Sequence, residues 1–153
     1  MQKIALTIFL SLVICFRIQA QSNDSLDVAN TINNFVSVFS NLDWDKFTSF
    51  FADDATAFFP PSAKIPQRAN NKNEIENIFQ KVFENARKGK SSPPYLTIEP
   101  KNLKIQMLND VAIVTFELND PGMFGRRTLV LKKENDHWLI VHLHASGIAT
   151  ENK

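Results

Sequence analysis

The chain has 153 residues, of which 44% are hydrophobic and 22% are charged, with 17 basic against 16 acidic side chains. This length suits one packed domain and is short for two, and the composition is that of a folded chain rather than a disordered one. A net charge so close to zero argues against nucleic acid as a partner.

The first 20 residues have the pattern of a secretory signal peptide. Lys3 precedes a mostly apolar run over 4–16, and Ala20 provides a small side chain at the expected cleavage position. The run is too short to cross a bilayer, which takes about 20 residues. We therefore expect removal of residues 1–20 and an exported protein, periplasmic or secreted, whose domain over 21–153 has no membrane contact.

Cleavage there changes the charge and the redox chemistry of the chain. It removes two of the 17 basic residues, Lys3 and Arg17, and none of the 16 acidic ones, so the mature net charge is −1. It also removes Cys15, the only cysteine. We expect neither a disulfide nor thiol chemistry in the mature protein.

Two helices and a short strand are expected in the first half of the mature chain. Residues 24–40 carry apolar side chains at the three- and four-residue spacing of one helical face. Asp43 is expected to begin a second, short helix, and Asp53 and Asp54 to end it. A short strand is then expected over 55–59, ahead of two prolines.

A third helix and four strands are expected in the second half. Asn71 followed by Glu74 resembles a capping box, and a regular apolar face covers 75–86. The strands are expected over 97–108, 111–118, 125–133 and 138–147, with two-residue turns at Asn109-Asp110 and Asn135-Asp136. Helices followed by an antiparallel meander predict an α+β fold rather than alternating βαβ units.

The turns predict the strand register. Placing Leu108 opposite Val111 brings alternate apolar side chains of the first hairpin onto one face. Placing Glu134 opposite His137 brings His144 opposite Arg127 and His142 opposite Leu129 in the second hairpin. A slip of one residue would put Arg126 in the place of Arg127.

The last strand has a face that changes from apolar to polar along its length. Side chains of a strand alternate between faces, so Trp138 and Ile140 are predicted to share one face with His142, His144 and Ser146. This is the pattern of a wall that is core at one end and pocket at the other. The opposite face of the hairpin is also apolar, and no helix remains to cover it, so a homodimer through this outer face is expected.

The residues Trp138-x-Ile140-Val141-His142-x-His144-x-Ser146-Gly147 resemble the end of SnoaL-like domains and of the calcium/calmodulin-dependent protein kinase II association domain. Residues 126–128 and 53–55 support this resemblance, which covers about 24–149. It implies the cone-shaped α+β fold of the nuclear transport factor 2-like superfamily, related to the cystatin-like fold, with a curved antiparallel sheet packed on the helices and enclosing a pocket. It does not imply one function.

Several side chains are candidates for the lining of this pocket. His144 is the candidate acid or base, because imidazole titrates near neutral pH, and Arg127 is a candidate for binding an anion. The alternatives are a histidine that only maintains the pocket's shape and an arginine that is a solvated strand-end charge. The complete set of predicted ligand-binding residues is His142, His144, Arg127, Ser146, Trp44, Phe58 and Tyr95.

No metal or cofactor is predicted. His142 and His144 point the same way, but a metal site needs a third ligand, and His137 lies in the turn. The chain has only 4 glycines and no glycine-rich phosphate loop.

Three functions remain open at this point. The first is an exported, dimeric domain that binds a small, partly apolar molecule, with an acidic molecule as one option. The second is an isomerase, cyclase or dehydratase without a cofactor that uses His144. The third is an assembly module with a vestigial pocket. A buried carboxylate near His144 would favour the enzyme, and a pocket filled by Phe side chains would favour the assembly module.

Overall fold

The computed structural model describes residues 23–60, 66–120 and 123–149, so the signal-peptide prediction and Cys15 lie outside the described residues. The elements, in chain order, are an N-terminal helix over 23–41, α2 (Trp44–Ser49), β1 (Phe51–Phe58), β2 (Arg68–Ala69), α3 (Lys72–Arg87), β3 (Lys101–Leu108), β4 (Val111–Asp120), β5 (Met123–Glu134) and β6 (His137–Ala149). This order confirms the predicted α+β fold.

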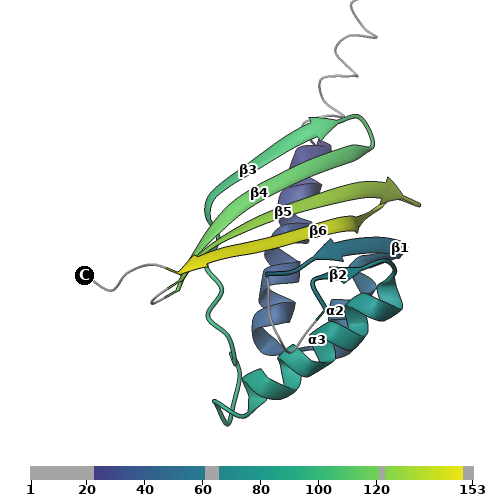
Figure 1. The fold of residues 1–153 in the computed structure, drawn as a ribbon. Helices are drawn as coiled ribbons and strands as arrows, with labels where there is room; N and C mark the ends of the chain where they lie inside the picture. Colours follow the sequence, from purple (N-terminus) through teal and green to yellow (C-terminus); the bar gives the residue numbers. More distant parts are fainter. Residues whose placement is uncertain (1–22, 61–65, 121–122, 150–153) are drawn as a thin grey trace, which may run out of the picture.

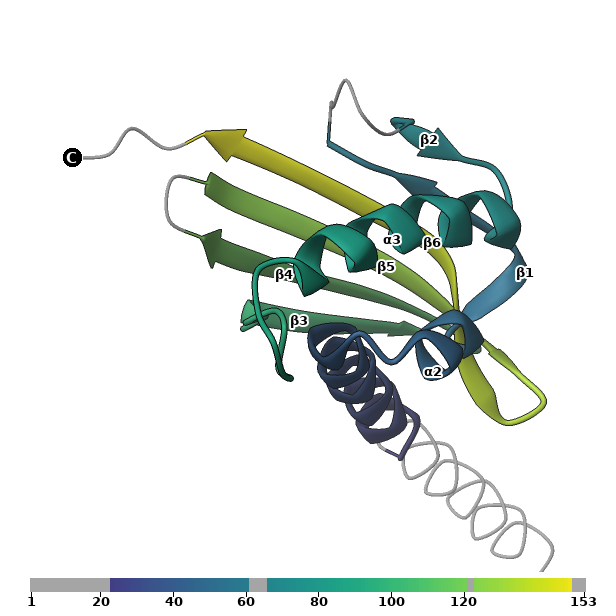
Figure 2. The ribbon, with the colours of Figure 1, turned by 90° about the horizontal axis from the view of Figure 1, so that it is seen from below.

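The strands form one curved sheet in the order β2-β1-β6-β5-β4-β3 (Figure 1). Neighbouring strands are antiparallel, except that β1 runs parallel to β6, which makes the sheet mixed. The helices gather on one side of the sheet, and the N-terminal helix passes behind it in Figure 1 (Figures 1 and 2). We call this side of the sheet the inner face and the opposite side the outer face.

Helices α2 and α3 begin where the sequence indicates. The side chain of Asn71 accepts a hydrogen bond from the backbone N–H of Glu74 at 3.0 Å, and Asp43 likewise accepts one from Lys46 at 3.4 Å. Each contact satisfies an N–H group that has no partner inside its helix. From this start, α3 buries the apolar face that its spacing predicts: Ile75, Ile78, Phe79 and Phe83.

The core between helices and sheet is largely aromatic. Phe47 of α2 is fully buried at its centre. Its ring centroid lies 5.5 Å from that of Phe35 on the N-terminal helix, 5.4 Å from Phe51 of β1 and 4.7 Å from Phe79 of α3. Rings at such separations make favourable offset or edge-to-face contacts. One ring therefore joins three helices and the sheet.

The predicted end of the second helix is wrong, and so are the predicted starts of the strands at 55 and 97, which begin at Phe51 and Lys101. Asp53 and Asp54 do not end α2, because α2 stops at Ser49 and both carboxylates lie exposed within β1. The pairing of β1 with β6 shifts between Phe51 and Thr56, and the two aspartates occupy this irregular stretch. A register shift leaves residues outside the regular ladder, where polar side chains can stay in water.

The β3–β4 hairpin has the predicted register near its turn. Leu108 pairs with Val111 and Ile105 with Val114. Further from the turn the register shifts between Lys101 and Lys104.

The β5–β6 hairpin has the predicted register only as far as Ile140. Glu134 pairs with His137 and Leu131 with Ile140, but the next pair is Val130 with His142. Val141 is therefore the extra residue of a β-bulge. A shift by one residue exchanges the two faces of everything that follows.

The bulge overturns the predicted pairing of His144 with Arg127. His144 lies opposite Thr128, and Arg127 lies opposite Ala145. Beyond the bulge, Leu143 and Ala145 are buried on the inner face while His144 is exposed. This arrangement keeps two apolar side chains in the core and leaves the imidazoles of β6 outside it, which avoids the cost of burying them.

Candidate functional site

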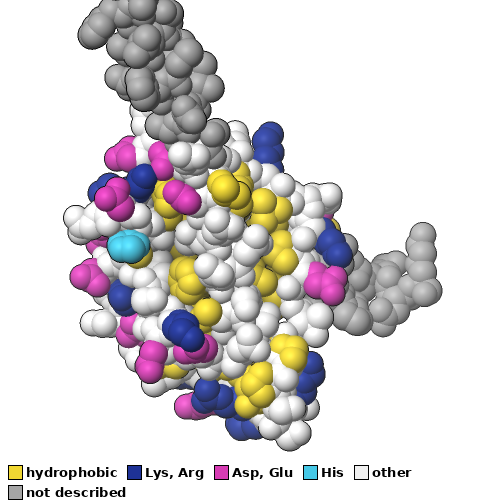
Figure 3. Space-filling model, turned by 180° about the vertical axis from the view of Figure 1, so that it is seen from behind, with side chains coloured by type: hydrophobic (Ala, Val, Ile, Leu, Met, Phe, Trp, Pro, Cys, Tyr) yellow, Lys and Arg dark blue, Asp and Glu magenta, His cyan; other side chains and the backbone are white. Residues whose placement is uncertain are grey.

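A cavity of about 200 Å³ lies between the inner face of the sheet and the helices. Its walls are almost entirely apolar, and they come from the N-terminal helix, α3, three strands and two connecting segments. The lining residues are Phe35, Val36, Phe39, Phe59, Pro60, Phe79, Val82, Ile98, Phe116, Leu118, Arg127, Leu143 and Ala145. Seen from the helix side, hydrophobic side chains are visible in several separate groups, with most of the charged side chains nearer the rims (Figure 3).

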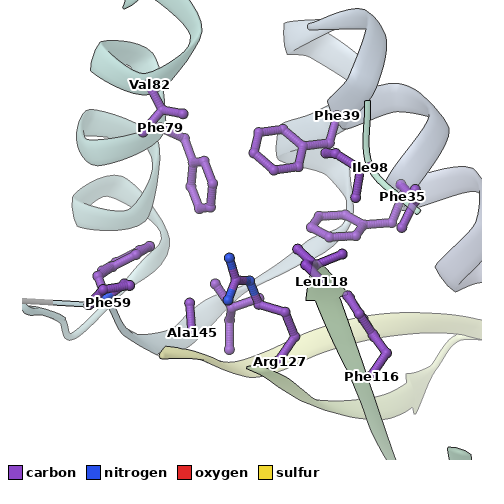
Figure 4. Close-up of a pocket in the computed structure, with 13 residues that line it drawn as sticks. Phe35, Phe39, Phe59, Phe79, Val82, Ile98, Phe116, Leu118, Arg127 and Ala145 are labelled. Carbon is purple, nitrogen blue, oxygen red and sulfur yellow. The ribbon is translucent and has the colours of Figure 1, made fainter. Parts of the chain in front are cut away.

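Arg127 is the only ionisable side chain among the described residues that line this cavity. Its guanidinium rises from β5 into the space between Phe79, Phe39 and Ala145 (Figure 4). Its Nη1 donates hydrogen bonds to the backbone carbonyls of Ser146 at 3.1 Å and Arg126 at 2.9 Å. The backbone of β5 and β6 thus holds a cationic, planar donor group against an apolar chamber.

The two candidate histidines lie on the other side of the sheet. His142 Nδ1 is 2.8 Å from the hydroxyl oxygen of Thr56, and the ring of Phe58 stands at 5.5 Å from that of His142 and 5.9 Å from that of His144. The guanidinium carbon of Arg68, on β2, lies over the Phe58 ring at 5.7 Å from its centre. The structure thus brings His142, His144 and Phe58 together, but on the outer face and away from Arg127.

The other predicted ligand-binding residues are dispersed. Ser146 faces away from the cavity and contributes only its backbone carbonyl, which accepts from Arg127. Trp44 packs on the core, with its ring 5.4 Å from that of Phe83. Tyr95 is half-buried, and its backbone N–H donates to the carbonyl of Ser40 at 2.9 Å. Neither aromatic residue lines the cavity.

The surroundings of His142 disfavour its charged form. Partial burial lowers the pKa of His142, and the neighbouring imidazole of His144 lowers it further. In the described part of the chain, no three His, Cys, Asp or Glu side chains come together as a metal site would require. Nor does any helix in that part have the length and apolar character that a bilayer crossing needs.

Apart from Arg127, which was predicted to line a pocket, the residues that enclose the cavity come from stretches interpreted mainly as core. Phe35, Phe39 and Phe79 belong to apolar helix faces, and nothing in their spacing distinguishes a cavity wall from a filled core. Phe59 directly follows the predicted wall residue Phe58, and it is the one of the two that reaches the inner side. Side chains along β1 alternate between the two faces of the sheet, and this alternation indicates which of the two phenylalanines points inward.

Comparison with known proteins agrees with this architecture. Residues 28–151 match the SnoaL-like domain family. The chain belongs to that family. The resemblance expected from the end of β6 is therefore confirmed, and it extends over nearly all the described residues of this SnoaL-like domain. A search of curated proteins finds no match.

Solved structures show the same fold at low sequence identity. A candidate dehydratase of the nuclear transport factor 2-like family from Streptomyces avermitilis is 18% identical with a TM-score of 0.70, over 85% of this chain and 99% of its own. A candidate ketosteroid isomerase from Parabacteroides distasonis is 17% identical with a TM-score of 0.55, over 79% and 85%. A candidate calcium/calmodulin-dependent protein kinase II association domain from Xanthomonas campestris is 21% identical with a TM-score of 0.54, over 82% and 87%. At such identities the likeness concerns the fold alone.

Proposed function

We propose that this SnoaL-like domain binds a compact apolar molecule that carries one acidic group, such as an aromatic acid with a single ring. The observation that supports this most is the placement of one guanidinium, that of Arg127, in a cavity otherwise lined by apolar side chains. The ring would lie among the phenylalanines, and the carboxylate would lie on Arg127. A guanidinium matches a carboxylate in both charge and planar geometry.

The cavity volume sets the size of this ligand. Cavities for drug-sized molecules measure about 300–1,000 Å³, and an apolar cavity of about 150 Å³ holds benzene in another protein. A volume of about 200 Å³ therefore suits one ring with a short acidic arm. The phenylalanine walls favour an aromatic ring, because edge-to-face contacts add to simple burial.

The position of His144 favours ligand binding over the isomerase, cyclase or dehydratase alternative. The candidate acid or base, His144, lies across the sheet from the cavity. No polar or charged residue of the described chain is fully buried, so the inward carboxylate that would favour an enzyme is not found there. The assembly-module alternative is less favoured, because the phenylalanine rings narrow the cavity without filling it.

The test compares phenylacetate with phenylacetamide by isothermal titration calorimetry. The two probes share a ring and an arm, and only phenylacetate is charged. We expect phenylacetate to bind about tenfold more tightly, and Arg127→Met to remove this preference, because a hydrogen bond to a charged group is lost. Arg126→Met is the matched control, since Arg126 is exposed and its guanidinium lies 5.4 Å from the centre of the Phe124 ring. Equal affinity for both probes in the wild type would refute the proposal.

Export and the homodimer stay predictions. The outer face would suit a second copy, because Phe58, Leu108 and Ile148 are 42%, 55% and 53% exposed and none of the described helices packs on that face. Light scattering at micromolar concentration would test the dimer, and N-terminal sequencing of exported protein would test cleavage after Ala20.

A further inference from the structure

Gly125 is buried on β5, two residues before Arg127 and on the same, inner face. Its register partners are Leu118 on β4 and Gly147 on β6. Glycine within a strand is less favourable than alanine, and it often marks a place where another group comes close. The group that comes close here is the end of the Arg127 side chain.

The guanidinium of Arg127 occupies the space that a side chain at position 125 would need. A Cβ atom added to Gly125 would lie 3.2 Å from Nη1 and 3.6 Å from Nη2 of Arg127. The first distance is shorter than an ordinary contact between heavy atoms, which is about 3.5–4.0 Å. The backbone of Gly125 does not have the positive φ that only glycine adopts readily, so the need for glycine comes from packing.

We propose that Gly125 is a positioning residue that sets the specificity of the cavity for acidic ligands. Without a side chain at position 125, the guanidinium can lie close to β5 with its Nη1 on the Ser146 carbonyl. A methyl group there would move the guanidinium by a few tenths of an ångström or turn it to another rotamer, and its alignment with a bound carboxylate would be poorer. This inference rests on the function proposed above, because that function makes Arg127 the cation that binds the ligand.

The test is a double-mutant cycle with Gly125→Ala and Arg127→Met, measured with phenylacetate and phenylacetamide. Gly125→Ala should lower the affinity for phenylacetate about threefold to tenfold and leave that for phenylacetamide unchanged. In the Arg127→Met background, Gly125→Ala should have no further effect, because the group through which it acts is gone. Gly89→Ala is the control, since a Cβ there meets only the Ala86 carbonyl at 3.6 Å, an ordinary contact.

A crystal structure of Gly125→Ala beside that of the wild type provides a second readout that needs no ligand. We expect the guanidinium to move away from position 125, either by a few tenths of an ångström or into a rotamer that leaves the Ser146 carbonyl, and an unchanged guanidinium would overturn the inference whatever the binding data show. If the wild type prefers phenylacetate, Arg127→Met abolishes the preference and Gly125→Ala does not alter it, the role of Gly125 is wrong while the proposed function stands. If the wild type shows no preference, the proposed function fails, and the crystal structures still decide the role of Gly125.

Discussion

The β3–β4 and β5–β6 hairpins each contain one register shift, but the shifts lie in different surroundings. In β3 the shift falls at the edge of the sheet beside Asn102, an exposed residue with a φ of 53°. In β6 it falls at Val141, in a strand with β5 on one side and β1 on the other. The edge shift lies among exposed residues, whereas the central one decides which side chains reach the cavity. The bulge in β6 affects the site because one face of that strand is buried and the other is exposed.

Joint deletion of Val141 and His142 should have the largest effect on this contrast. It would remove the extra residue and one more, so that Leu143 turns outward and His144 comes opposite the buried Leu129. We expect a loss of at least about 4 kcal/mol in the free energy of unfolding, or no cooperative folding at all, because a leucine leaves the core and an imidazole enters it. Deletion of Val141 alone is the matched control and should cost about 1 kcal/mol, because every other pair of the hairpin stays in place. Urea denaturation followed by circular dichroism measures both, and equal losses would show that the register of β6 does not decide which side chains are buried.

Alanine substitutions at two neighbouring residues of β6 should differ in their effect on stability, because the residues lie on opposite faces of the sheet. Leu143 is 4% exposed on the inner face and His144 is exposed on the outer face. Leu143→Ala should cost about 2 kcal/mol, toward the low end for buried leucines because the side chain borders a cavity. His144→Ala should stay within about 0.5 kcal/mol of the wild type. Comparable losses in urea denaturation would mean that His144 is a core residue after all.

The smallest expected effect is a pH dependence from His142. Its pKa is lowered in the folded protein by partial burial and by His144, so the unfolded chain takes up the proton first as the pH falls. The stability associated with neutral His142 is fully present above its ordinary pKa of about 6.5 and declines as the pH falls below that value. Urea denaturation between pH 8 and pH 5 should therefore show a shallower decline for His142→Gln than for the wild type. Parallel declines would contradict this assignment.

Much of the fold follows from the sequence because its signals are local. The capping residues Asp43 and Asn71 begin their helices, and the turns at Asn109 and Asn135 have the positive φ angles, 58° and 48°, that asparagine tolerates. The pairs nearest each turn are as predicted, since a short loop sets the register of the residues beside it. Arg127 also lies on the inner face with Leu129, as the hairpin pattern predicts.

The site depends on tertiary structure, and the reason lies in the residues of β6 itself. Apolar side chains stand on both faces of the run from Trp138 to Ala145, so hydrophobic alternation does not determine which face points inward after Ile140. Packing against β1 decides it, because Thr56 supplies the hydrogen-bonding partner of His142 from 86 residues away. The family, the elements other than β2 and the inward position of Arg127 follow from the sequence. Only the assembled sheet and helices decided that the histidines lie outside and that phenylalanines from separate elements enclose a cavity around that arginine.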